Sequence, residues 1–253
     1  MGETTVAPPM PEEPPAGSFL SRFFGVFISP GETFEDIARR PGFIAPLVTV
    51  VVAAWVLFDT MYWKVGMETM TRLTLERSPF TSHMPPEQLE KAIHDSAAHL
   101  TRQLVITDVS IPIALTIILL IEAGLGMMIV NAILGGQAKF KTLFSVVTYA
   151  QLPTILGNVL GMVVILFGGT DNLDPQNPIP LNLAFFLNYK EVPKPLFSLA
   201  GSADILVVWM VILLGLGMSK AAGGKVKALP ITLCFVGLWA IWIIGKLALS
   251  AIF

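Results

Sequence analysis

The chain has 253 residues, of which 54% are hydrophobic and 13% are charged, and its mean hydropathy is +0.71. Ordinary soluble domains carry about 25% charged residues, so this composition predicts a protein that is solvated largely by lipid. The formal net charge of -2 leaves no basic surface for a nucleic-acid partner. The single cysteine, Cys234, excludes an intramolecular disulfide and a thiolate metal cluster.

The N-terminal region is expected to form a tail followed by two short helices. Residues 1–17 are rich in Pro and Glu and lack the basic and apolar regions of a signal peptide, so we expect a disordered tail. Residues 18–28 are rich in aromatic side chains but too short to span a bilayer, which predicts a helix lying in the interface. Ser29, Pro30 and Glu32 predict a capping box at the start of the second helix.

Five apolar runs predict membrane spans, because a hydrocarbon core of about 30 Å is crossed by roughly 20 helical residues. The predicted spans are residues 43–62, 109–134, 143–167, 203–218 and 230–253. The fourth is short, so we expect it to pack against neighbours or to borrow residues 196–199. Pro153 is expected to kink the third. The predicted fold is an all-α membrane bundle of about five helices, with short N-terminal interfacial helices, in one domain over residues 18–253.

Two long loops separate the spans on one side of the predicted bundle. In the first, Pro85-Pro86-Glu87 opens an amphipathic helix that is expected to run straight into span two. Its apolar residues recur at helical spacing, and they are Leu89, Ile93, Ala97, Leu100 and Leu104. The second long loop, residues 170–201, is rich in Asn, Asp and Pro.

The short loops predict the orientation of the bundle. Lys139 and Lys141 lie between spans two and three, and Lys220, Lys225 and Lys227 lie between spans four and five, with no acidic residue in either loop. Because Lys and Arg near the span ends favour the cytoplasmic side, we expect both loops and the N-terminus to be cytoplasmic. The two long loops and the C-terminus would then lie outside.

Several motifs follow one another in a recognisable order. They are the segment PGETFEDI before span one, a Gly-Gly turn before span three, the segment YAQLP within span three, and a tryptophan in span four. In this order they resemble the Yip1-domain family of five-span membrane proteins. The residues that carry the resemblance are Pro30, Thr33, Phe34, Ile37, Gly135, Gly136, Tyr149, Pro153 and Trp209.

The resemblance implies a helical membrane bundle with a cytoplasmic N-terminus. For eukaryotic members it also implies a role in vesicle traffic through small GTPases. The short Pro-rich tail and the long first loop look more like bacterial members, so we expect the bacterial plasma membrane and do not carry over a GTPase partner.

Polar residues inside the predicted spans are the best candidates for a functional site, because a charge near the bilayer centre costs at least a few kcal/mol. Five of them fall at one depth, roughly 20–25 Å from the cytoplasmic ends at 1.5 Å per residue. They are Asp59, Glu122, Asn158, Asp204 and Lys246. They could form structural contacts, such as an ion pair of Lys246 with Glu122 or Asp59, or line a pocket for transport or ligand binding.

Other site types have little support in the sequence. His83, His94 and His99 all lie in the first long loop, and a solvated helix face is favoured over a metal site there. Gly157 and Gly161 form a GxxxG pattern that fits packing within the bundle or homodimerisation.

No phosphate-binding loop or nucleophile elbow is present, and no cofactor is expected. The leading hypothesis is therefore a non-enzymatic Yip1-type protein that contacts the lipid bilayer and organises membrane or partner proteins. The alternative is a small transporter or channel that uses the polar cluster.

Overall fold

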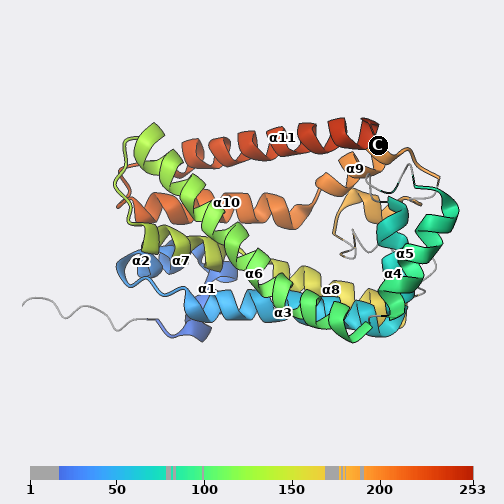
Figure 1. The fold of residues 1–253 in the computed structure, drawn as a ribbon. Coiled ribbons are helices and arrows are strands. Elements are labelled where there is room, and N and C mark those ends of the chain that lie inside the picture. The colour runs from blue at the N-terminus through green and yellow to red at the C-terminus, as the bar shows by residue number, and fades with distance from the viewer. Residues whose placement is uncertain are drawn as a thin grey trace, which may run out of the picture.

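The computed structural model describes residues 17–77, 81, 84–98, 100–168, 177, 179, 181–188 and 191–252. These residues form helices and connecting turns, with one isolated antiparallel bridge between Asn182 and Asp204 and no strand among them. The long helices lie side by side, and the short ones gather at the two ends (Figure 1). The predicted tail, apart from Gly17, lies outside the described residues.

The N-terminal helices α1 (Phe19–Ile28) and α2 (Pro30–Arg39) form a tight hairpin. Ser18 caps α1, since its Oγ accepts a hydrogen bond from the Ser21 N–H at 3.2 Å. The predicted capping box on α2 is wrong in its hydrogen bonds, because the Ser29 side chain makes no cap bond. The Ser29 backbone N–H already donates to the Gly25 carbonyl at 2.8 Å and closes α1, so it is not free for Glu32.

The first span, α3 (Ile44–Val65), is followed by a helical hairpin outside the spans, α4 (Met67–Arg77) and α5 (Pro86–Ala98). Arg72 on α4 reaches Glu90 on α5 with two hydrogen bonds of 2.6 and 3.0 Å. The amphipathic helix does not run straight into span two, since α5 and the following helix α6 (Leu100–Met127) point in different directions (Figure 1).

The next span continues α6 through a π-helical segment, Met128–Ile133, before the chain turns at Gly135 and Gly136. The third span is divided into α7 (Phe140–Ala150) and α8 (Thr154–Phe167). The interruption falls at residues 151–153, where the sequence predicts a kink at Pro153. Proline fits there because it lacks a backbone N–H and so cannot supply the bond that a continuous helix needs.

The C-terminal part begins with a 3-10 turn, Leu183–Phe186, and a short helix α9 (Lys194–Ser202). The apolar residues 196–199 belong to α9 and do not extend span four, because the chain breaks at Ala203 and Asp204 before α10 (Ile205–Ala221). The last helix is α11 (Ala228–Ile252), which packs against α10 and α9.

Among the described residues, four helical stretches are long and apolar enough to cross a membrane, which confirms the all-α membrane fold. They are Ile44–Val65, Asp108–Ile133, Phe140–Phe167 and Ala228–Ala248. The fourth predicted span corresponds to α10, which is apolar but has only 17 residues. It packs against α2, α7 and α11.

The two Lys-containing turns, after the π-helical segment and after α10, lie at the same end of the bundle as α1 and α2 (Figure 1). The elements α4, α5 and α9 lie at the opposite end. The main buried core lies at the first end and extends through α7 and α10, whereas a smaller core of Leu57, Met61, Met70 and Ile165 joins α3, α4 and α8.

Candidate functional site

The α2 helix is seated on the bundle by its apolar face. Phe34 and Ile37 are completely buried, and Thr33 is almost so. Phe34 packs against α10 at Gly217, where an added Cβ would lie 2.7 Å from Phe34 Cδ1 and 2.5 Å from Val146 Cγ1. A side chain at position 217 would therefore displace Phe34, so the glycine is needed for α2 to approach α10 this closely.

The α1 helix presents aromatic rings to the same bundle. The ring of Phe27 lies edge-on to Trp209 of α10 with centroids 5.5 Å apart, and the ring of Phe19 lies 6.4 Å from Tyr149 of α7. Gly25 lets the two helices of the hairpin touch, because a Cβ there would collide with the Thr33 hydroxyl. The predicted helix thus forms over the expected residues, with an aromatic face turned toward the other helices, and its place in the membrane interface stays a prediction.

The opposite face of α1 is also apolar but has no cover within the described chain. Leu20, Phe24 and Ile28 recur every fourth residue, and 65%, 58% and 81% of their surfaces are exposed. Residues at this spacing lie above one another on a helix, so they form one continuous outer stripe.

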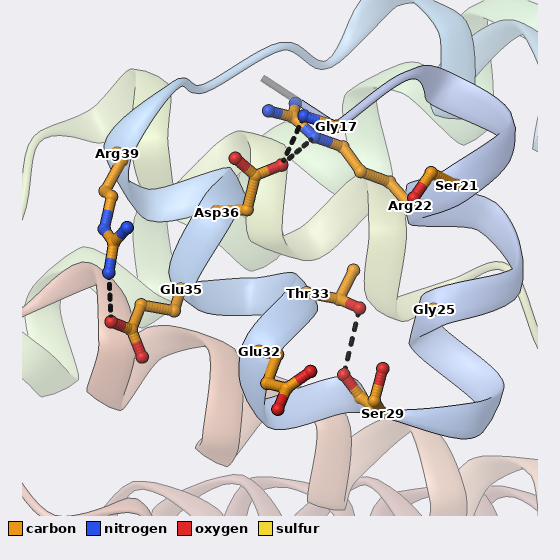
Figure 2. A pocket seen from close by; sticks show the side chains of 10 residues that line it. All are labelled: Gly17, Ser21, Arg22, Gly25, Ser29, Glu32, Thr33, Glu35, Asp36 and Arg39. Atoms are coloured by element: carbon orange, nitrogen blue, oxygen red, sulfur yellow. Dashed lines mark hydrogen bonds and ion pairs between the residues drawn. The ribbon is translucent and has the colours of Figure 1, made fainter. Parts of the chain in front are cut away.

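A partly buried ion pair joins the two helices of the hairpin. Arg22, which is 8% exposed, donates from Nε to Asp36 Oδ2 at 2.7 Å (Figure 2). Its Nη1 donates to the Arg40 carbonyl at 3.1 Å. Burial acts to lower the pKa of the Arg22 guanidinium, but hydrogen bonds to Asp36 and Tyr149 outweigh it and raise the pKa. Arg22 therefore stays charged and fixes the crossing of α1 and α2.

A second ion pair joins the hairpin to the bundle. Lys220 Nζ, in the last turn of α10, lies 3.0 Å from Glu35 Oε2, and Arg39 also binds Glu35. These two cations hold the pKa of the Glu35 carboxyl below its ordinary value, and Lys220 has the larger effect. Between α1 and α2 lies an open hollow of about 510 Å³ lined by polar and charged residues (Figure 2). Glu32, on its wall, is exposed.

The Gly-Gly turn is built by a side chain from the preceding helix. Asn131 Nδ2 donates to the Ala138 carbonyl at 2.9 Å, and the Ala138 N–H returns a bond to Asn131 Oδ1 at 2.8 Å. Gly135 has a φ of +69°, which favours glycine, and Gly136 is too close to Val130 to carry a side chain. The residues that carried the family resemblance therefore shape the hairpin's seat, the turn beside it, or the break at Pro153.

The predicted polar cluster is spread over five helices. Asp59 is exposed on α3, Asn158 is buried on α8, and Lys246 is exposed on α11. Asp204 caps α10, where its Oδ1 accepts from the Leu206 N–H at 2.7 Å. Within the described residues no hydrogen bond or ion pair joins any two members of the cluster, Glu122 included.

Glu122 has a partner that the sequence did not suggest. Its Oε2 accepts a hydrogen bond of 2.9 Å from Gln151 Nε2, so the carboxyl of α6 meets an amide at the break between α7 and α8. Gly157 of the predicted GxxxG pair serves packing within the chain, since a Cβ there would lie 2.7 Å from Leu206 Cδ1.

The remaining sites can be placed only in part. His83 and His99 lie outside the described residues, and in the part of the chain that is described no group of three or more His, Cys, Asp or Glu is placed to hold a metal. Sequence reasoning missed Arg22, Asp36 and the contact of Glu35 with Lys220. A signal was present for Arg22, since it is the one charge in an apolar segment and such a charge needs a partner when buried.

The fold and its hairpin define a multi-pass helical membrane protein whose N-terminal helices are packed onto the bundle. Comparison with known families agrees, because the Yip1 domain matches residues 24–245, which is nearly the whole chain. The chain belongs to the Yip1-domain family. No curated protein and no solved structure matched it.

Proposed function

We propose that this protein organises membrane or partner proteins by contact, without catalysing a reaction, and that the α1–α2 hairpin is the contacting element. The observation that carries the proposal is the outer stripe of Leu20, Phe24 and Ile28 on a helix that is otherwise packed against the bundle. Large apolar stripes on ordered helices are typical of surfaces that meet lipid or another protein.

The hairpin can hold such a stripe in a fixed position. The buried ring of Phe34, the ion pair of Arg22 with Asp36, and the ion pair of Glu35 with Lys220 fasten it at three separate points. A partner that meets a fixed surface loses less conformational entropy than one that meets a mobile segment, which supports recognition by this face.

A photo-reactive amino acid placed at Phe24 tests this function in native membranes. We expect reproducible crosslinks to the same membrane protein, or to a second copy of the chain, from Phe24. The matched control is Phe27, three residues further along α1. Its ring faces Trp209, so a photo-reactive group there should crosslink within the chain. Equal partner yields from the two positions, or capture of lipid alone at Phe24, would remove the support for partner contact.

We further propose that the protein lies in the bacterial plasma membrane with its N-terminus in the cytoplasm. The two Lys-containing turns lie at the hairpin's end of the bundle, which supports this orientation. Two exposed glutamines, Gln137 in the first turn and Gln88 on α5, allow a matched test with single cysteines in a chain lacking Cys234. In intact cells an impermeant thiol reagent should modify position 88 and spare position 137; the reverse pattern would invert the protein.

A transporter or channel remains the second candidate, and the contact of Glu122 with Gln151 favours it. The two groups meet at a helix break inside a predicted membrane span, and breaks of this kind accompany ion and substrate sites in transporters. Glu122→Gln and Lys246→Met should then each abolish a flux in proteoliposomes while helicity is retained. Unchanged fluxes in both variants would leave Glu122 a packing residue.

A further inference from the structure

The chain has two Gly-Gly turns, at residues 135–136 and 223–224, which are two copies of one turn motif. Residues 131–140 read NAILGGQAKF and residues 219–228 read SKAAGGKVKA, so the glycines, the following small apolar residue and the next lysine fall in register. In each copy the first side chain bonds the carbonyl seven residues later: Asn131 to Ala138 at 2.9 Å, and Ser219 to Val226 at 2.6 Å. The sequence GLGM precedes both copies, at residues 124–127 and 215–218.

The two copies touch one another. A Cβ on Gly136 would lie 2.9 Å from Val226 Cγ2, and Ala138 and Val226 are both buried. The first copy has seven residues between its GLGM and its glycines and the second has four, so the first is three residues longer. The π-helical segment Met128–Ile133 lies in that longer stretch and takes up part of the extra length. The paired turns are therefore one fixed unit.

This unit displays four lysines at the start of two membrane spans. Lys139 and Lys141 flank the first residue of α7, and Lys225 and Lys227 precede α11. All four are exposed, and no carboxylate among the described residues pairs with any of them. Lys220, the remaining lysine of the two turns, differs from these four because it forms an ion pair with Glu35.

We propose that Lys139, Lys141, Lys225 and Lys227, here called the lysine platform, bind the phosphate-bearing headgroups of anionic phospholipids. Each lysine lies within three residues of the first residue of a span, at Phe140 or Ala228, so its ammonium would lie at the depth of headgroup phosphates. Basic residues at that depth attract anionic lipid, by roughly fivefold in binding per residue. This proposal rests on the two turns and not on the outer stripe of α1, so it does not depend on the proposed function.

The test uses the full chain reconstituted in phosphatidylcholine vesicles that contain trace spin-labelled phosphatidylglycerol or phosphatidylcholine. The fraction of each label immobilised at the protein gives their relative association constants. We expect a preference for phosphatidylglycerol of several-fold that falls as salt rises, because surface charges are screened. Replacing all four lysines with Gln should reduce the preference to near one.

Three controls separate the proposal from its alternatives. Replacing the four lysines with Arg should keep the preference, and Lys64→Gln with Lys91→Gln, at the opposite end, should leave it unchanged. Asn131→Ala keeps every lysine but releases the first turn, so it should lower the preference without removing it. Equal binding of both lipids by the unaltered protein, or an undiminished preference in the four-Gln variant, would overturn the platform. Displacement of the lipid by millimolar glycerol phosphate would show a site for soluble phosphates and overturn the assignment to lipid.

Discussion

The two ends of the molecule are built in contrasting ways. At the hairpin's end, every residue of α7 from Thr142 to Ala150 is buried, and α2, α7 and α10 share one core. At the other end, α9 has no buried residue, and α4 and α5 are joined by an exposed pair between Arg72 and Glu90. Most of the packing energy is therefore placed where the N-terminal helices meet the spans, and substitutions should be costly there and mild elsewhere.

The largest effect is expected from Phe34→Ala. Removing a completely buried ring leaves a cavity that costs about 3–5 kcal/mol of unfolding free energy. Phe167, whose surface is 86% exposed at the end of α8, is the matched control and should cost little when replaced by Ala. Reversible unfolding in mixed micelles measures both changes. Similar losses for the two variants would mean that packing is not concentrated at the hairpin.

Gly217→Leu should have the next largest effect. The new side chain would collide with Phe34 and Val146, and relieving that overlap costs about 3 kcal/mol, at the upper end of the range for an overpacked core. Gly237 on α11 has nothing near its Cβ position and an exposed surface, so Gly237→Leu serves as the control. Hydrogen exchange should speed up in α2 for the first variant alone; fast exchange in both would point to a general effect of leucine.

Asp36→Ala should weaken the hairpin by about 2 kcal/mol, because it leaves the nearly buried Arg22 without its charged partner. At the opposite end, Glu90→Ala removes an ion pair that water surrounds, so its effect on unfolding should be much smaller. Unfolding midpoints of the two variants, measured side by side, test the contrast. It fails if loss of the exposed pair is as damaging as loss of the buried one.

The smallest effect is a pH dependence of the contact between α2 and α10. Since the pKa of Glu35 is held below its ordinary value of 4.5, the contact is fully stabilising above that pH and weakens as pH falls through the lowered pKa. The hydrogen-exchange protection of α2, corrected for the intrinsic exchange rate at each pH, should therefore fall on acidification below about pH 4.5. Glu35→Gln should abolish the part due to this carboxyl. An identical pH response in that variant would assign the effect to other acids.

Four of the five predicted spans could be recognised because each is a long apolar run, whereas α10 has only 17 residues. The limits of α1 lie within a residue of those expected. The hydrogen bonds of the hairpin could not, because they depend on how the chain folds back on itself. Ser29 ends one helix as it begins the next, and a pattern for helix starts takes no account of the N–H used by the helix before it. Glu35 and Lys220 are 185 positions apart, so their pairing follows only from the packing of α2 on α10.

The predicted polar cluster illustrates a different limit. The sequence predicts the depth of Asp59, Glu122 and Lys246 along their spans, but depth does not determine which way a helix face turns. Glu122 turns toward Gln151, whereas Asp59 and Lys246 lie on exposed faces of their helices. Whether the five residues act together stays a prediction.

The interruption at residues 151–153 has a mechanical consequence for the third span. Its first half, α7, packs mainly with α2, α6 and α10, and its second half, α8, packs mainly with α3. We therefore expect the break to act as a joint between two parts of the bundle, because bonds between residues three apart, at Leu152 and Thr154, replace the regular α-helical bonds there. Bilayers of different thickness impose different tilts on a span. In this protein the change in tilt can be taken up at the joint by α8 and α3, while the helices that carry the hairpin keep their packing.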